Sequence, residues 1–116
     1  MKILILEDDP VRWKHFKQAL AGHELIITEH TKEAIELLSK NMFEVLFLDH
    51  DLGGLQMVAS GDGTGYEVAK WLNEHPERIP KEVYLHSLNP AGRANMKQMI
   101  PGAVEAPFAW LNIKTS

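Results

Sequence analysis

The chain has no cysteine in its 116 residues, and this absence excludes disulfide bonds and thiolate metal sites. Without a sign of an oxidising compartment, a cytoplasmic location is expected. Long apolar runs are also missing, since no stretch approaches the ~20 residues of a membrane-spanning helix. The apolar run at residues 2–6 is too short for a signal peptide. No membrane partner is therefore expected.

Positive charge is scarce as well, with 12 Lys and Arg against 16 Asp and Glu and a net charge of -4. A broad nucleic-acid-binding surface is not expected, because such surfaces depend on clustered basic side chains. A small phosphorylated ligand or an RNA end remains compatible with this charge. The length suits one core, so we expect a single domain over residues 1–116, and no pattern indicates an oligomeric state.

Short apolar runs alternate with amphipathic segments along the whole chain. The runs predict strands at residues 2–6, 25–28, 43–48, 82–86 and 102–105. The amphipathic segments predict helices at residues 10–21, 31–39, 64–75 and 90–100. This alternation is typical of βαβ units, so we predict an α/β fold, a flavodoxin-like three-layer sandwich. Its five parallel strands take the order 2-1-3-4-5, and a fifth helix is short or missing.

Polar side chains follow three of the predicted strands. Parallel strands place their carboxyl ends at one edge, and ligands bind there at the switch point between strands 1 and 3. Carboxylates this close repel one another unless a cation joins them, and Mg²⁺ or Mn²⁺ suits such oxygens together with a phosphate. Zinc on His50 or His86 is a less favoured alternative. The residues at these strand ends are Glu7, Asp8, Asp49, His50, Asp51, His86, Ser87 and Asn89.

Each of these features alone has an ordinary structural explanation. An acidic pair after a strand can be a helix cap and a solvated charge, and Asp-His-Asp can be a simple loop. Asn89 before Pro90 can be purely a helix cap. A functional site is favoured because the features occur together at three strand ends that the fold makes neighbours.

These residues also resemble a known family. "ILILEDDP" (residues 3–10) is similar to the opening of a response-regulator receiver domain, whose acidic pair binds Mg²⁺. The resemblance assigns that role to Glu7 and Asp8. "LFLDHDLGG" (residues 46–54) resembles the strand that carries the receiver's phosphoacceptor aspartate, here Asp49. The backbone carbonyl of Asp51 would then also bind the metal.

The departures from receivers resemble an offshoot, the cyclic-phosphate-processing receiver-like domains. Ala106 precedes Pro107 where receivers carry a lysine that holds the acyl phosphate. His86 or Ser87 occupies the receiver's Ser/Thr position, and the loop at residues 53–65 is longer. The strings that carry the likeness to the offshoot are "LDHDLGG", "GTGYEVAKWL" and "HSLNPAG".

This resemblance implies a metal-dependent phosphoesterase-like domain that processes or binds a cyclic phosphate of a nucleotide or an RNA 2′,3′-cyclic end. Glu7, Asp8 and Asp49 would hold Mg²⁺ or Mn²⁺. One of His86 and His50 would act as general base and the other as general acid, with His86 the more essential. Ser87 and Asn89 would hydrogen-bond the phosphate. Backbone N–H groups would wrap the ligand in the glycine-rich segment, at Gly53, Gly54, Gly63 and Gly65.

Two other functions remain open. The chain can be a degenerate receiver that signals through protein contacts, as Glu7, Asp8 and Asp49 suggest. It can also bind a cyclic nucleotide without turnover, because the same groups would serve both purposes.

Overall fold

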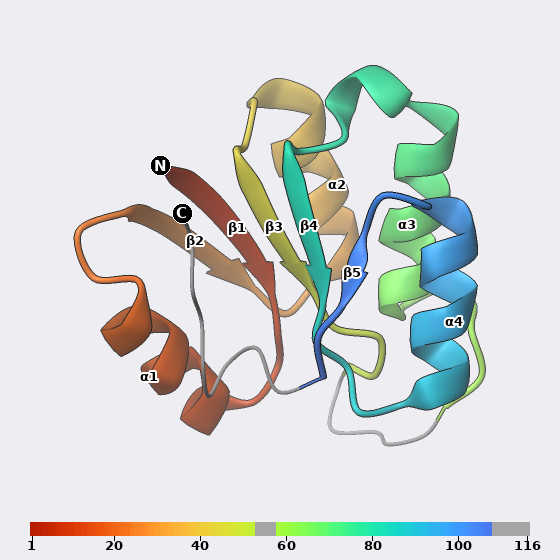
Figure 1. Ribbon diagram of the computed structural model, residues 1–116, viewed down its shortest axis with the longest axis horizontal. Helices are drawn as coiled ribbons and strands as arrows, with labels where there is room; N and C mark the ends of the chain where they lie inside the picture. The colour runs from red at the N-terminus through yellow and green to blue at the C-terminus, as the bar shows by residue number, and fades with distance from the viewer. Residues whose placement is uncertain (53–57, 108–116) are drawn as a thin grey trace.

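The computed structural model describes residues 1–52 and 58–107. These residues form five strands, four α-helices and one 3₁₀ helix, arranged as Figure 1 shows. The strands are β1 (Lys2–Leu6), β2 (Glu24–Thr28), β3 (Val45–Leu48), β4 (Glu82–Leu85) and β5 (Val104–Glu105). The helices are α1 (Pro10–Ala19), α2 (Thr31–Lys40), α3 (Gly65–Glu74), η1 (Pro76–Arg78) and α4 (Pro90–Met99). Gly53, Gly54 and the expected fifth helix fall outside the described residues.

The strands form one parallel sheet in the order β2-β1-β3-β4-β5, as predicted. β1 lies between β2 and β3 and is buried almost throughout, which explains its unbroken apolar sequence. The register pairs Leu6 with Leu48 and Leu48 with Leu85. The carboxyl ends of β1, β3 and β4 are therefore level with one another. The first residue after each of these strands lies beside the first residue after its neighbour.

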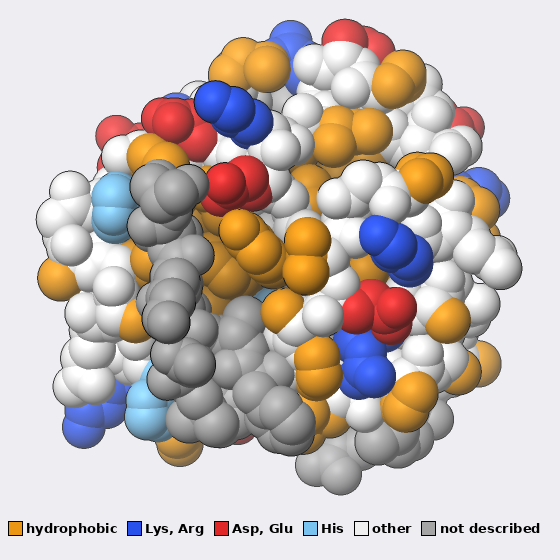
Figure 2. Space-filling view, in the orientation of Figure 1, with side chains coloured by type: hydrophobic (Ala, Val, Ile, Leu, Met, Phe, Trp, Pro, Cys, Tyr) orange, Lys and Arg blue, Asp and Glu red, His pale blue; other side chains and the backbone are white. Residues whose placement is uncertain are grey.

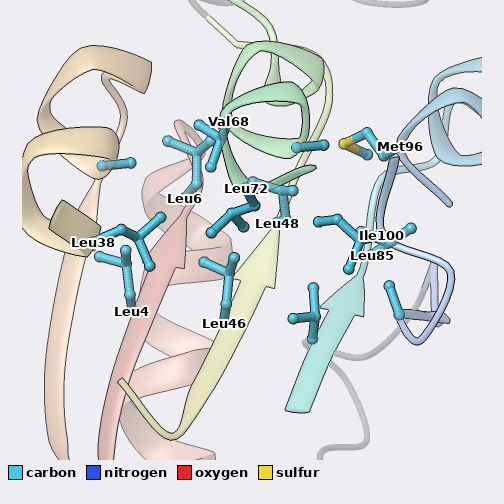
Figure 3. Packing of buried hydrophobic residues seen from close by; sticks show 14 of the residues in the cluster. Leu4, Leu6, Leu38, Leu46, Leu48, Val68, Leu72, Leu85, Met96 and Ile100 are labelled. Atoms are coloured by element: carbon cyan, nitrogen blue, oxygen red, sulfur yellow. The ribbon is translucent and has the colours of Figure 1, made fainter. Parts of the chain in front are cut away.

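Helices cover both faces of the sheet (Figure 1). On one face, Phe16 of α1 and the C-cap residue Leu20 pack with Ile5, Val45 and Phe47. On the other face, α2, α3 and α4 form a larger core with β1, β3 and β4 (Figure 3). This core includes Leu6, Leu38, Leu46, Leu48, Val68, Leu72, Leu85 and Met96. The side chains of β3 thus alternate between the two cores, as strand geometry requires.

The helices begin where capping chemistry allows. The Asp9 carboxylate accepts the Val11 N–H at 2.9 Å, and the Asn89 side chain accepts the Gly92 N–H at 3.0 Å, each with proline in the first turn. At α2 the capping position is His30, and Thr31 instead donates its hydroxyl to Glu67 of α3 at 2.9 Å. Asp9 and Asn89 both sit at the carboxyl edge of the sheet.

None of the helices in residues 1–52 and 58–107 has the length and apolar character needed to cross a membrane. On the face shown in Figure 2, acidic and basic side chains are interspersed and do not gather into one basic patch.

Candidate functional site

Glu7, Asp49 and His86 form one row across the sheet. Each follows the last residue of its strand, and the paired residues before them are Leu6, Leu48 and Leu85. The Asp49 N–H donates to Leu6 O and the His86 N–H to Leu48 O, both at 3.2 Å, so the backbone ladder continues into the row. Strand alternation then turns all three side chains to the α1 face of the sheet.

The row is compact and buried. One ligand atom from each of the three residues lies within 4.8 Å of the other two. Glu7 and His86 are 0% exposed and Asp49 is 3% exposed. Three ionisable groups that are this close together and buried need partners of opposite charge or hydrogen bonds, because burial destabilises the charged form of each group. Sequence alternation left open whether His86 or Ser87 faces the carboxylates, and in the structure it is His86.

His86 bridges the carboxylates and the α1 core. Its Nε2 lies 2.9 Å from Glu7 Oε1, and because a carboxylate only accepts, Nε2 carries the hydrogen. The ring meets Phe16 edge-on, with centroids 5.3 Å apart. Its Nδ1 is buried, with no hydrogen-bond partner in the described part of the chain. The imidazole therefore binds Glu7 through Nε2, while its buried Nδ1 has no hydrogen-bond partner among the described residues.

Glu7 is fixed from several sides. Its Oε2 accepts the backbone N–H groups of Asp8 and Asp9, each at 3.0 Å. The indole Nε1 of Trp13 donates to the Glu7 carbonyl at 2.7 Å. The turn from β1 into α1 thus wraps the carboxylate, which leaves Oε1 for His86 and Arg12.

Arg12 is a member of the site that the sequence analysis missed. Its Nη1 lies 3.4 Å from Glu7 Oε1 and 3.8 Å from Asp49 Oδ2. The signal was its place in the first turn of the helix that follows the acidic pair, three residues after the capping Asp9. A helix that starts at the carboxyl edge of a sheet holds its first-turn side chains over that edge.

The surroundings push the pKa values of the two carboxyls apart. Burial alone would raise the pKa of Glu7, but the hydrogen bond and charge of His86, the Asp9 N–H and Arg12 outweigh burial and lower it to about 2. Burial raises the pKa of Asp49 to about 7, and the Glu7 charge adds to this against the opposite effects of His86, the His50 N–H and Arg12. Glu7 is therefore ionised at neutral pH, whereas Asp49 is poised to change its charge.

His50 and Asp51 belong to a second network on the opposite face of β3. His50 is 0% exposed; its Nδ1 lies 2.7 Å from Asp51 Oδ1 and its Nε2 lies 2.8 Å from Ser60 Oγ. Asn95 donates to Ser60 Oγ at 2.8 Å. Ser60 and Asn95 were not expected from the sequence, and no pattern in the sequence pointed to them. The two candidate histidines are thus separated by the sheet.

Asn89 and Ser87 have their polar atoms engaged within the fold. The Asn89 amide donates to Asp51 Oδ1 at 3.1 Å and to Val58 O at 3.0 Å, while its oxygen caps α4. The Ser87 hydroxyl accepts the Asn89 N–H at 3.1 Å. Asn89 is therefore the link between α4 and the His50–Asp51 network, and Ser87 shapes the turn that leads into it.

Gly63 and Gly65, which were expected to wrap a ligand, donate their backbone N–H groups within the fold. The Gly63 N–H donates to Glu67 Oε1 and the Gly65 N–H to His50 O, both at 2.9 Å. A Cβ on Gly65 would lie 1.7 Å from the Asp49 carbonyl oxygen, so glycine is needed for close packing against β3. Asp8 is half-buried beside Glu7 and lies outside the compact group of three.

The compact group has the chemistry of a divalent-cation site. Two buried carboxylates converge, and the uncompensated Nδ1 of His86 indicates a polar environment that the described residues leave incomplete. Carboxylate oxygens suit Mg²⁺ and Mn²⁺, whereas the imidazole suits Mn²⁺ better than Mg²⁺. The residues therefore fit such an ion with Glu7 and Asp49 as its protein ligands.

The fold is shared with response regulators. The chain superimposes on response regulator TrrA from Thermotoga maritima, in complex with Mg²⁺-BeF, with a TM-score of 0.69 and 19% identity, covering 97% of this chain and 91% of that one. The Mn²⁺-bound form of response regulator Rcp1 gives a TM-score of 0.67 and 20% identity, covering 98% and 96%. A Francisella receiver domain gives 0.63 and 20%, covering 90% and 80%.

A search of curated proteins gives no match. A family model does match, over residues 2–102, and it describes the cyclic-phosphate processing receiver domain. The match spans the strands β1 to β4 and the whole Glu7–Asp49–His86 row. The chain belongs to the cyclic-phosphate processing receiver domain family.

Proposed function

We propose that the carboxyl edge of the sheet binds one Mg²⁺ or Mn²⁺ and, with it, hydrolyses a cyclic phosphate of a nucleotide or of an RNA 2′,3′-cyclic end. The observation that carries the proposal is the buried row of Glu7, Asp49 and His86, with ligand atoms within 4.8 Å of one another. Two carboxylates and a proton-carrying imidazole at one point are the groups that metal-assisted phosphoester hydrolysis needs. Membership of the family supports the choice of a cyclic phosphate.

The residues divide the chemistry between them. A divalent ion, when bound, polarises the phosphoryl oxygens and offsets the charge that develops on them. Glu7 and Asp49 hold that ion, with Asp8 and the Asp51 carbonyl as further candidate ligands. Water adds to phosphorus, one ring P–O bond breaks, and the released oxygen takes a proton.

His86 is the proposed proton carrier. Its Nε2 bears a hydrogen beside Glu7, at the carboxylates. His50 is a weaker candidate, because both of its ring nitrogens bond within the second network across the sheet. Asn89 and Ser87 are proposed to orient the phosphate only indirectly, since their polar atoms already bond within the fold.

Turnover of a panel of cyclic phosphates tests the proposal. The panel contains 2′,3′-cyclic and 3′,5′-cyclic nucleotides, with Mg²⁺, Mn²⁺ or EDTA. We expect EDTA-sensitive hydrolysis, lowered by His86→Ala about 10²–10⁴-fold, the usual effect of losing a general acid or base. His75→Ala is the matched control, because His75 stacks on Trp71, away from the row. Equal activity of His86→Ala and wild type would remove His86 from the mechanism.

A phosphoaccepting receiver module is the second candidate, favoured by the buried Asp49 at the end of β3 of a receiver fold. Ala106 stands where receivers have lysine, so an acyl phosphate on Asp49 lacks that cation. The panel therefore includes an arm with acetyl phosphate and Mg²⁺. Stoichiometric labelling of Asp49 without hydrolysis of any cyclic phosphate would favour the receiver module. Binding of a cyclic nucleotide without turnover would indicate a sensor.

A further inference from the structure

Arg12 stands where a cation and a phosphate would meet. Its Nη1 lies 3.4 Å from Glu7 Oε1 and 3.8 Å from Asp49 Oδ2, and its Nε lies 3.9 Å from Asp9 Oδ2. The side chain is 18% exposed, whereas the side chain of Glu7 is 0% exposed. The guanidinium therefore lies beside the buried carboxylates, and its side chain is the more exposed partner in each pair.

These contacts are longer than those of a tight ion pair. Charge-assisted N–H···O bonds usually measure about 2.7–2.9 Å, and arginine prefers to hold one anion with two parallel bonds. Arg12 lies more than 3.3 Å from each of the three carboxylates Glu7, Asp9 and Asp49. Arg12 thus compensates the charge of the row at distances longer than those of a tight pair with any one of these three carboxylates.

A divalent ion on Glu7 and Asp49 would compete with Arg12 for the same oxygens. Two cations cannot share those oxygens without strong repulsion at these distances. The guanidinium must then move away from Glu7 and Asp49 by turning its long side chain. Asp9 remains beside it, with Oδ2 3.9 Å from Nε, and a phosphate bound to the ion would be a second anion within reach.

The described residues offer few other cations to a phosphate at this site. Among the residues that the structure describes, Arg12 is the only Lys or Arg in an ion pair with Asp49. Ala106, before Pro107, carries no charge. Arg93 pairs with Glu105 at 3.4 Å and donates to Ser87 O at 2.7 Å, which directs it to β5.

We infer that Arg12 is a phosphate-binding residue that exchanges partners: it neutralises Glu7 and Asp49 in the metal-free protein and binds two oxygens of the ligand's phosphate once the ion is present. The inference rests on the proposed function and deepens it. The inference assigns the phosphate contact to a planar guanidinium. Arg12→Lys should therefore keep the positive charge but lose the two parallel hydrogen bonds.

Two titrations of the full chain by calorimetry test the exchange. The first measures Mg²⁺ binding, and the second measures inorganic phosphate binding at saturating Mg²⁺. Arg12→Ala should tighten Mg²⁺ binding about 3–10-fold, because a competing charge is removed. The same variant should weaken phosphate binding about 10-fold or more, because two charge-assisted hydrogen bonds are lost. Arg12→Lys should bind Mg²⁺ like the wild type and phosphate at an intermediate strength.

Arg78→Ala is the matched control, because Arg78 lies in η1 and contacts Met42. It should leave both titrations unchanged. Arg12→Gln keeps most of the side chain and replaces Arg12→Ala if that variant does not fold. Weaker binding of both Mg²⁺ and phosphate by a folded Arg12 variant would mean a structural role and would overturn the inference. Unchanged phosphate binding would overturn it as well. A wild type that binds no Mg²⁺ would instead contradict the proposed function.

Discussion

Asp49 shows how burial sets the behaviour of a single residue. Its pKa is raised to about 7, chiefly by burial, so the folded protein favours the protonated form far above the ordinary value of 3.8. The stability that this preference contributes is complete below about pH 4 and is lost as the pH rises to about 7. The effect of Glu7 has the opposite dependence on pH. Its pKa is lowered to about 2, so the stability that it contributes is complete above about pH 4.5 and is lost as the pH falls to about 2.

Asp49→Asn should therefore stabilise the metal-free protein at pH 8. The amide is neutral and similar in shape, so it avoids the buried charge that the wild type carries there. We expect a gain of about 1–4 kcal/mol in the free energy of unfolding, shrinking towards zero at pH 4. Denaturant unfolding in EDTA at pH 4, 6 and 8 measures it. A gain that does not change with pH would show that the Asp49 charge is not its cause.

The sequence could predict which residues meet at the carboxyl edge of the sheet, but only in part the directions of their side chains. Alternation along β3 places Asp49 and His50 on opposite faces, and the structure agrees. Arg12 was not predicted, because its role depends on where the first turn of α1 lies in space. Ser60 was not predicted either, since an irregular loop has no periodicity from which to infer side-chain direction.

At the scale of elements, α4 is fixed by the network across the sheet from the row. Asn89 caps the helix and also bonds to Asp51, so the cap and the network form one structure. Gly92 in the first turn of α4 lies directly against the His50 ring. A Cβ at this position would lie 2.4 Å from His50 Cγ, closer than any real contact.

Gly92→Ala should accordingly destabilise the protein by about 1–3 kcal/mol, because α4 or the buried His50 must shift. Gly102→Ala is the matched control, since a Cβ there meets nothing within 4 Å. Thermal or denaturant unfolding of the two variants gives the comparison. If Gly92→Ala were as stable as Gly102→Ala, the close contact of α4 with His50 would not hold in solution.

Helix starts were predictable wherever a capping residue precedes proline, as at Asp9 and Asn89. The start of α2 was less clear, because Thr31 resembles a cap but uses its hydroxyl for Glu67 of α3. Such a tertiary partner lies 36 residues away and leaves no trace in the local sequence. Strands and helices can thus be predicted from the local sequence, whereas the tertiary partner of a given side chain cannot.

At the scale of the whole molecule, the order β2-β1-β3-β4-β5 follows from the sequence because few parallel arrangements satisfy right-handed crossovers. That order makes β1, β3 and β4 neighbours, and the level ends of these strands bring Glu7, Asp49 and His86 into one row. The position of the site was therefore predictable from topology. Its charge balance was not, because it depends on burial and on Arg12.

Thermal unfolding during a Mg²⁺ and Mn²⁺ titration tests the central claim, a divalent-cation site at Glu7 and Asp49, most directly. An ion that binds only the folded protein raises the melting temperature in proportion to its occupancy. We predict a saturable rise for the wild type that EDTA reverses, and its loss in Asp49→Asn, although that variant is the more stable one without metal. No rise in the wild type, or an equal rise in Asp49→Asn, would contradict the claim.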